Sequence, residues 1–170
     1  MIEPSSILSA EDEVVSALAE GADRFAVYRA VQTALGRLVG HRLFTLLVLL
    51  PGGEEVQRFW SSDEKAYPLT GRKRVGTTPW GELVLRNRQC YLGRDAAGIR
   101  WAFADHELIA SLGLASVVNV PIVHHGTALG TMNLLDVEGH YDDQSVAASR
   151  RFAAYLIPAF LAEREAAKTS

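Results

Sequence analysis

The stretch from Ser116 to Asp136 constrains the fold of this chain more than any other part of it. Its residues read SVVNVPIVHHGTALGTMNLLD, two mostly apolar runs on either side of a glycine turn. Such runs around a turn predict an antiparallel hairpin of two buried strands. Asn119 and Asn133 interrupt the apolar runs, one in each strand. The fold must therefore accommodate an amide side chain in each of two buried strands.

Alternation along each strand assigns these asparagines to a face. Asn119 shares its face with Val117, Pro121 and Val123, and Asn133 shares its face with Leu129, Thr131 and Leu135. If that face looks into a cavity, the two amides supply the directional hydrogen bonds that a mostly apolar pocket needs for specificity. The alternative is that each amide ties down neighbouring backbone or a loop, as buried polar side chains usually do.

Helices and further strands are expected around this hairpin. Apolar periodicity and capping residues predict helices over residues 11–20, from Asp23 to about Gly40, 80–87 and 105–113, and a long helix from Asp142 that Pro158 bends or ends. Short apolar or branched runs predict strands over residues 43–50, 54–62, 66–69 and 89–93. Residues 70–79 and 94–105 are expected to be loops. Arg72, Lys73 and Arg74 in the first loop are candidates for holding an anion, although a solvated loop is the simpler interpretation.

Length and composition favour one domain over residues 1–170, with N-terminal helices in 1–40, the sheet and a pocket in 41–140 and a closing helix in 141–165. The formal net charge of -3, with both signs interspersed, provides no field for nucleic acid or anionic lipid. The single cysteine forms no internal disulfide, and the acidic start does not resemble a signal peptide, so a cytoplasmic location is expected. The longest strongly apolar run, Leu43 to Leu50, is too short to cross a bilayer.

The order of these elements indicates an α+β domain, with antiparallel hairpins at both ends of a sheet and helices around them. The segments GLASVVNVPIVHHGTALGTMNLLD, YDDQSVAASRRFAAYLIPAF and LFTLLVLLPGGEEVQRFW resemble the last hairpin, the closing helix and the opening hairpin of the GAF domain family. GAF domains are small-molecule-sensing modules of signalling proteins. The resemblance implies a profilin-like, six-stranded antiparallel sheet, with the terminal helices on one face and a ligand cavity under helices and loops on the other.

Aromatic and charged residues near this cavity face supply further candidates. Trp101 and Phe103 lie in a segment expected to be irregular, and a tryptophan in such a segment must bury its ring somewhere. The candidate ligand-binding residues are Trp60, Trp80, Glu82, Cys90, Trp101, Phe103, Asp105, His106, Asn119 and Asn133. For the aromatic residues the alternative role is core packing, and for the charged ones it is stabilisation of helix ends by the helix dipole.

The sequence gives less support to a catalytic or cofactor-binding role. Cys90 has no spacing motif that links it to a base, and a buried structural thiol is the simpler interpretation. Relatives that reduce free methionine sulfoxide use several cysteines, whereas this chain has one. Tyr91 follows Cys90 where bilin-carrying relatives commonly have histidine, and the N-K-F-D-E signature of cyclic-nucleotide-binding relatives does not map onto the sequence. No chelating motif accompanies His124 and His125, which adjoin the turn, so no metal or cofactor is expected.

Three functions are compatible with these patterns. The first, which we favour, is a sensory module that binds a small organic ligand and signals as a homodimer through its terminal helices, where Leu156, Phe160 and Leu161 extend beyond what a small sheet would cover. The second is a small redox or acid-base enzyme on the same scaffold, using Cys90 or a group of Glu82, Asp105 and His106. The third is a degenerate domain retained for dimerisation.

Overall fold

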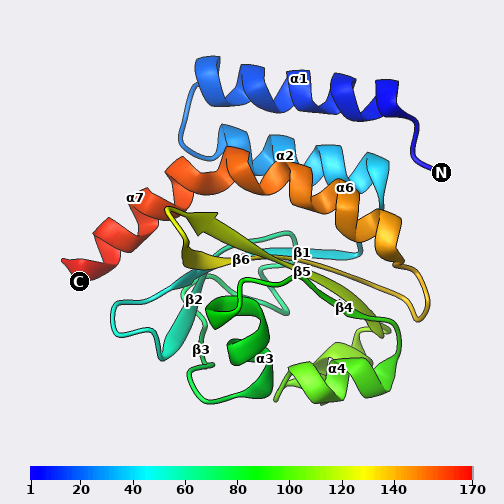
Figure 1. Cartoon of the computed structure of the whole chain (residues 1–170), viewed down its shortest axis with the longest axis vertical. Helices are drawn as coiled ribbons and strands as arrows, with labels where there is room; N and C mark the ends of the chain where they lie inside the picture. The colour runs from blue at the N-terminus through cyan, green and yellow to red at the C-terminus, as the bar shows by residue number, and fades with distance from the viewer. Residues whose placement is uncertain (170) are drawn as a thin grey trace.

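A six-stranded antiparallel sheet forms the centre of the molecule, in the order β3-β2-β1-β6-β5-β4 (Figure 1). The computed structural model describes residues 1–169. The strands are β1 (Leu43–Leu49), β2 (Glu55–Ser61), β3 (Arg72–Arg74), β4 (Tyr91–Gly93), β5 (Ser116–His124) and β6 (Thr127–Asp136). The predicted hairpin from Ser116 to Asp136 is the β5–β6 pair and occupies the sheet interior beside β1. The predicted α+β class and the GAF-like sheet are confirmed.

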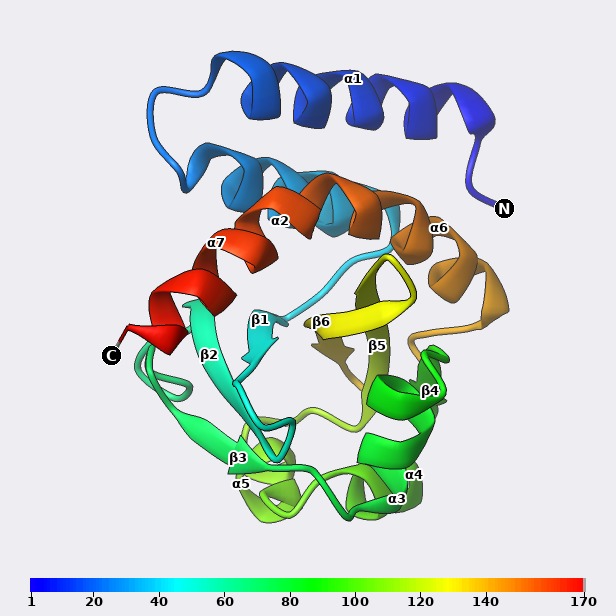
Figure 2. The same cartoon turned by 60° about the vertical axis from the view of Figure 1, so that its left-hand side comes forward.

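Helices cover both faces of this sheet (Figures 1 and 2). On one face lie α1 (Pro4–Glu20), α2 (Ala26–Leu38), α6 (Asp143–Ala153), the 3₁₀ turn η2 (Ala154–Leu156) and α7 (Ile157–Lys168). On the other face lie α3 (Pro79–Gly81), the π-helical turn η1 (Glu82–Arg86), α4 (Ala96–Ala102) and α5 (His106–Ser111). The helix α1 forms an outer layer on top of α2 and α6 (Figure 2). No helix within residues 1–169 has the length and apolar content needed to cross a membrane.

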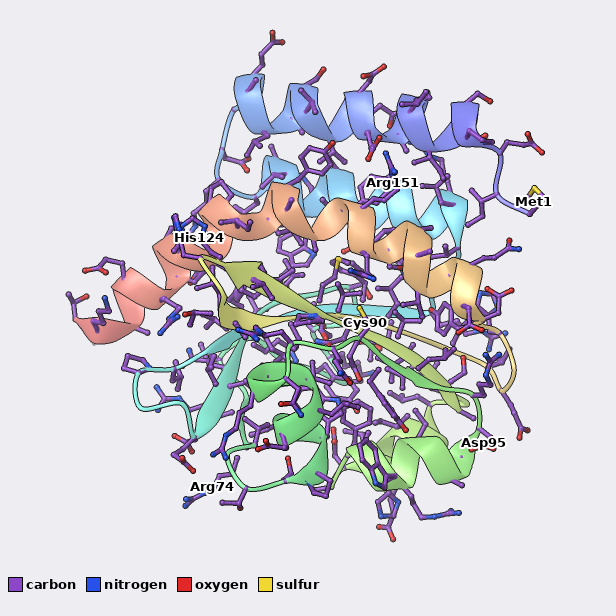
Figure 3. The ribbon with its side chains drawn as sticks, viewed as in Figure 1. Met1, Arg74, Cys90, Asp95, His124 and Arg151 are labelled. Atoms are coloured by element: carbon purple, nitrogen blue, oxygen red, sulfur yellow. The ribbon has the colours of Figure 1, made fainter. Side chains whose placement is uncertain are left out.

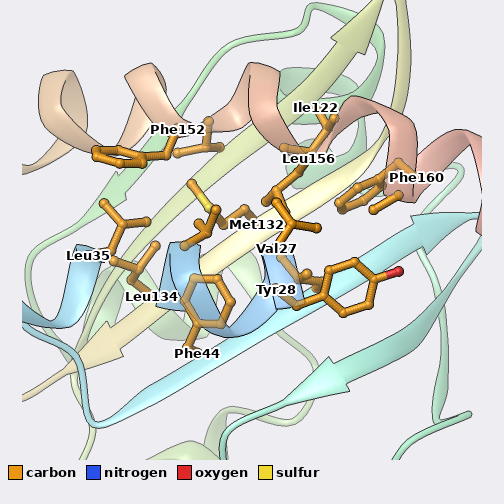
Figure 4. Close-up of a cluster of buried hydrophobic side chains, with 14 of the residues drawn as sticks. Val27, Tyr28, Leu35, Phe44, Ile122, Met132, Leu134, Phe152, Leu156 and Phe160 are labelled. Atoms are coloured by element: carbon orange, nitrogen blue, oxygen red, sulfur yellow. The ribbon is translucent and has the colours of Figure 1, made fainter. Parts of the chain in front are cut away.

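The main hydrophobic core lies between the sheet and the terminal helices (Figure 4). Phe44 and Leu46 of β1 point into it together with Met132 and Leu134 of β6. The helices contribute Leu35, Phe152, Leu156 and Phe160, all fully buried. Burying a side chain of this size stabilises the fold by about 1.5–3 kcal/mol. Leu156 and Phe160 therefore belong to the core of their own chain, which corrects the expectation that they extend beyond it; of the three residues named, Leu161 alone is exposed.

The closing helix begins and bends where its sequence indicates. The Asp142 carboxylate accepts a hydrogen bond from the Ser145 amide at 2.9 Å, and the Asp142 backbone N–H donates to Oγ of Ser145 at 3.3 Å, which completes a capping box. Pro158 lacks the N–H that would bond to the carbonyl of Ala154 four residues earlier. The helix accordingly tightens into a 3₁₀ turn at Ala154–Leu156 before α7 continues, so the predicted interruption is confirmed.

Three elements differ from the sequence-based expectation. Residues 66–69 do not form a strand; the third strand is β3, within the predicted loop, and it pairs with Glu55–Gln57 at the sheet edge. Charged side chains are common on edge strands because they discourage pairing with other chains. The charged sequence of β3 therefore has the pattern of a solvated loop rather than that of a strand. The predicted loop 94–105 contains α4, whose first turn is capped by Asp95 accepting from the Gly98 amide at 2.9 Å. The first helix begins at Pro4 rather than near residue 11, since proline is favoured in a first turn.

Phe160→Ala tests how much the closing helix contributes to the core. We expect the free energy of unfolding to fall by about 3–5 kcal/mol, because the substitution leaves a cavity against Phe59 and β6. Equilibrium denaturation in urea gives the measurement. Glu165→Ala, on the exposed side of the same helix, is the control and should change stability by less than about 0.5 kcal/mol. Equal midpoints for the two variants would show that α7 contributes nothing to the cooperative core.

Candidate functional site

A cavity of about 350 Å³ opens on the sheet face opposite the terminal helices. It lies between β1, β2 and β3 of the sheet and the segments that carry α3 and the end of α4. Its apolar lining comes from Leu47, Val56, Val75, Trp80, Ala102 and Phe103. Its polar lining comes from Arg72, Lys73, Arg74, Thr78 and Asp105, and Figure 3 shows Arg74 at the outer edge of the molecule beside β3. The cavity is thus apolar with a mainly cationic rim.

A second, much smaller cavity of about 20 Å³ adjoins it deeper under the sheet face. Leu47, Lys73 and Phe103 line both cavities, so these three side chains form the wall between them. The remaining lining residues of the small cavity are Leu43, Thr45, Arg58, Tyr67, Ile109, Asn133 and Leu135. The alternation of β1 sends Leu43, Thr45 and Leu47 to this face while Phe44 and Leu46 enter the helix-side core.

An ion pair joins β3 to the start of α5 at the boundary between the cavities. The Lys73 ammonium donates to both carboxylate oxygens of Asp105 at 2.8 Å, and the Tyr67 hydroxyl donates to Oδ2 of Asp105 at 3.0 Å. Burial alone would raise the pKa of Asp105, but the Lys73 charge and the two donors outweigh it and hold that pKa below its ordinary value. Burial lowers the pKa of Lys73, and Asp105 offsets this only in part.

Arg58 of β2 brings a second cation to the small cavity. Its side chain is only 5% exposed, and its guanidinium lies 4.7 Å from the centroid of the Tyr67 ring. Nη1 donates to the carbonyl of Pro68 at 2.9 Å. Nε is buried and has no hydrogen-bond partner among residues 1–169. An arginine in this position holds the loop after β2 in place while part of its donor capacity stays unused.

A row of hydrogen bonds across the sheet explains the two asparagines. The Trp80 indole N–H donates to Oδ1 of Asn119 at 2.9 Å, and Nδ2 of Asn119 donates to Oδ1 of Asn133 at 2.7 Å. Nδ2 of Asn133 then donates to Oγ1 of Thr45 at 3.2 Å. Strand register produces this row, because Asn119 lies directly opposite Asn133 and Asn133 directly opposite Thr45. The amides therefore cross-link β5, β6 and β1 and fix Trp80 in the cavity wall.

The structure brings several of the predicted site residues together. Trp80, Phe103 and Asp105 line the larger cavity, and Asn133 lines the smaller one. Asn119 is fully buried behind Trp80 and reaches the cavities through that side chain. The face that Asn119 and Asn133 share is therefore the face of the sheet on which the two cavities lie.

Trp60 lies on the opposite face of the sheet. Its indole N–H donates to Oε1 of Gln32 on α2 at 2.8 Å, and its ring stacks on Phe25. A β-bulge in the β1–β2 pairing is responsible: Arg58 lies opposite Leu47, but Trp60 lies opposite Leu46, so the extra residue between them reverses the alternation. Trp60 consequently does not contact the cavity.

The expectation that Trp101 lies in an irregular loop and buries its ring is wrong. It lies on α4, not in an irregular loop, and its side chain is 47% exposed with one face against the Tyr91 ring at 5.0 Å. A helix allows one residue to project outward while its neighbours are buried, so the ring does not have to be covered. Ile99 is the buried residue of that helix.

The other predicted residues are dispersed. Glu82 is exposed and pairs with Arg86 at 3.1 Å, and His106 is half-buried without lining either cavity. Cys90 lies between the sheet and α6 (Figure 3), in a groove of about 510 Å³ that Arg150 and Val120 also line. Burial raises the pKa of the Cys90 thiol. The proposed group of Glu82, Asp105 and His106 is therefore not assembled around one cavity.

Arg58 and Tyr67 are site residues that the sequence analysis missed. Tyr67 falls in the wrongly predicted strand 66–69, and Arg58 is the single basic residue of β2, without any motif around it. A signal exists for Lys73: alternation in the run Arg72-Lys73-Arg74 points the middle residue to the face opposite its neighbours. In the structure Lys73 points inward and both arginines are exposed.

The part of the chain that the structure describes contains no group of three or more His, Cys, Asp or Glu side chains arranged to hold a metal ion. The ring centroids of His124, the last residue of β5, and His125 lie 4.0 Å apart, and His125 adopts a positive φ of 48° in the turn. Figure 3 places His124 at the tip of the β5–β6 hairpin beside α7.

Comparisons with known proteins agree with this architecture. The model of the GAF domain family matches residues 13–157. The GAF domain of a phosphoenolpyruvate-protein phosphotransferase from Coxiella burnetii is similar with a TM-score of 0.74 and 16% identity over 98% of both chains. Free methionine-R-sulfoxide reductase from Neisseria meningitidis, in complex with its substrate, is similar with a TM-score of 0.71 and 16% identity over 98% of this chain and 96% of that one.

The GAF domain of an Acinetobacter phosphoenolpyruvate-protein phosphotransferase is also similar, with a TM-score of 0.71 and 11% identity over 96% of this chain and 98% of that one. At these identities the likeness is one of fold. A search of curated proteins finds no significant sequence match.

Asn119→Ala tests the row of hydrogen bonds. The substitution leaves the Trp80 indole N–H and Oδ1 of Asn133 without their partner. Each unsatisfied buried group costs about 1–3 kcal/mol, so for these two groups we expect the free energy of unfolding to fall by about 2–6 kcal/mol in chemical denaturation. Asn87→Ala, at an exposed asparagine beside η1, should be close to neutral. A stable Asn119→Ala variant with impaired ligand binding would instead make Asn119 a ligand contact.

Proposed function

Because this chain belongs to the GAF domain family, we propose that it is a sensory module that binds a small organic ligand in the cavity walled by Trp80 and Phe103. The observation that carries this proposal is the cavity itself, which opens on the sheet face that terminal helices leave free. Its volume of about 350 Å³ is within the usual range for ligand pockets, about 300–1,000 Å³. Trp80, Phe103, Asp105 and Asn133 are the predicted residues that we propose contact the ligand or its surroundings.

The lining has the composition that small-molecule sites have. Apolar and aromatic side chains provide most of the contact area, and a few polar groups fix orientation. Here the donors are held in place: Lys73 and Tyr67 are positioned by their hydrogen bonds to Asp105, and Asn133 belongs to the row that spans three strands. Preorganised groups of this kind favour specific binding because little side-chain entropy is lost when a ligand arrives.

An enzyme on this scaffold receives less support. Reduction of a sulfoxide by a thiol needs a nucleophilic cysteine at the substrate and a second thiol to resolve the product. Cys90 lines a different groove from the aromatic cavity, and burial raises its pKa, which disfavours the reactive thiolate. The alternative of a reductase-like activity is therefore weaker than the binding function.

The partner we propose is a second copy of this chain, bound through the outer helix α1. That helix exposes Leu8, Val15 and Leu18, spaced seven and three residues apart along one stripe, and α7 exposes Leu161. Apolar stripes with this spacing pair in helical bundles. A ligand then acts by favouring one arrangement of the helices over another. A cytoplasmic location is part of the same proposal and fits the single, unpaired Cys90.

Indole resonances in a ¹H–¹⁵N NMR spectrum test ligand binding at the proposed cavity. The three tryptophans lie in three different places, since Trp80 lines the cavity, Trp60 is on the opposite sheet face and Trp101 is exposed on α4. We expect small-molecule fragments that bind to shift the Trp80 indole signal, because its N–H is fixed to Asn119, and to leave Trp60 unchanged. Assignment uses Trp80→Phe and Trp60→Phe.

The same spectra contain the result that would reject this function. If a library of several hundred chemically diverse fragments shifts Trp101 or Trp60 but never Trp80, the cavity is not a ligand site.

Leu8→Glu tests the dimer. Placing a charge in an apolar helical interface should weaken self-association at least about tenfold, measured by sedimentation equilibrium. Leu108→Glu is the matched control, since Leu108 is also an exposed leucine but lies on α5 at the cavity side of the molecule. A wild-type protein that stays monomeric at high concentration, or equal weakening by both variants, would contradict an interface at α1.

A further inference from the structure

The geometry around Lys73 assigns a chemical class to the ligand: we infer that it is an apolar, aryl- or alkyl-bearing carboxylate whose carboxylate replaces that of Asp105 beside Lys73 and Tyr67. This inference rests on the proposed function, because it concerns the same cavity. It goes further by identifying Asp105 as an internal substitute for the ligand's own anionic group.

Charge in the two cavities is the first reason. Asp105 is the only acid among the residues that line them, whereas Arg58, Arg72, Lys73 and Arg74 are all cationic. Arg72 directs its Nε to Oε1 of Gln57 at 3.0 Å and is exposed, so water screens its charge. Lys73 and Arg58 are the inward-facing cations, and the one carboxylate that lines the cavities, that of Asp105, is hydrogen-bonded to Lys73. The interior therefore favours binding of a further negative charge.

The unused donor of Arg58 is the second reason. A buried guanidinium is stabilised by an acid partner, and Arg58 has instead a neutral carbonyl and an aromatic ring. Its Nε is buried without a hydrogen-bond partner in residues 1–169, at the wall of the small cavity. An anion that enters beside Lys73 brings the opposite charge that this side chain lacks.

The ion pair of Lys73 with Asp105 is accessible to a competing anion. The side chains of Lys73 and Asp105 are 29% and 26% exposed, so the pair is reached from solvent. An uncompensated opening of such a partly buried pair would leave Lys73 without its counter-charge, whereas an anionic ligand supplies that charge as Asp105 leaves. Asp105 also precedes α5 at its N-cap position, yet its side chain makes no capping hydrogen bond there because it is directed to Lys73. Release from Lys73 leaves this carboxylate free to turn towards its own helix or to water.

Size selects a carboxylate over a larger anion. The small cavity measures about 20 Å³, which is room for about one water molecule. A ligand anion must therefore occupy mainly the space that the Asp105 carboxylate vacates, and that space has the dimensions of a carboxylate. The adjoining cavity of about 350 Å³ then receives the rest of the ligand against Val56, Val75 and the rings of Trp80 and Phe103.

The experiment compares three probes of nearly equal shape: phenylacetate, phenylacetamide and 2-phenylethylamine. Dissociation constants come from titrations of the Trp80 indole signal. We expect the wild-type protein to bind phenylacetate about tenfold or more tightly than the neutral amide, and the amine least. In Asp105→Asn, the internal competitor is gone, so phenylacetate should bind about tenfold tighter than to wild type while the amide is unchanged.

Two further variants complete the test. Lys73→Met should abolish the preference for the acid, while Arg100→Gln, which removes an exposed positive charge on α4, should leave it intact. If the amide or the amine binds as tightly as the acid, or Asp105→Asn does not strengthen acid binding, the carboxylate inference fails while the ligand-binding function stands. If none of the probes binds wild type or Asp105→Asn, the carboxylate inference fails, and the ligand-binding function fails with it only if the fragment library also leaves the Trp80 signal unchanged.

Discussion

The hydrogen bond between Asn119 and Asn133 is the interaction on which the cavity side of this molecule depends. Both faces of the central strands are covered, so a polar group there has no water to bond to. Polar side chains lie at directly opposed positions of β5, β6 and β1, and each forms a hydrogen bond with the side chain on the neighbouring strand. The row ends on Trp80, and a structural requirement of the strands thereby fixes the orientation of a cavity-lining ring.

The same strands present different side chains to the two faces of the sheet. The helix side is filled by large apolar side chains and closed by α7, with Phe160 packed so near Gly130 that a methyl group there would collide with the Phe160 ring and the Leu47 carbonyl. The other side retains Arg58, Lys73, Tyr67 and Asp105 among apolar residues. Such a cluster contributes less stability than apolar packing of equal volume, which is a common feature of functional sites.

The sequence predicts the structure correctly where interactions between residues close together in the chain determine it. The β5–β6 hairpin, the capping box at Asp142 and the interruption before Pro158 follow from turn chemistry, capping and a missing amide hydrogen. Alternation also put Asn119 on the face opposite Val118 and Val120, which lie in the helix-side core. The predictions were wrong where pairing with residues distant in the chain determines the structure. β3 is a strand because Glu55–Gln57 pairs with it. The bulge beside Phe59 points Trp60 to the sheet face opposite that of Arg58.

Asp105 is another residue whose partner is distant in the chain, and its position is relevant to the proposed signalling function. Sequence assigns Asp105 to capping its own helix, whereas the structure directs it to Lys73, which lies 32 residues away along the chain. A ligand shifts a conformational equilibrium only by the difference in its affinity for the two states. In the proposal made above, the pairing of Asp105 with Lys73 occludes the anion position, and a carboxylate ligand binds only where that pair is open. In the same proposal, the Lys73–Asp105 pair is then the link between occupancy of the cavity and the start of α5.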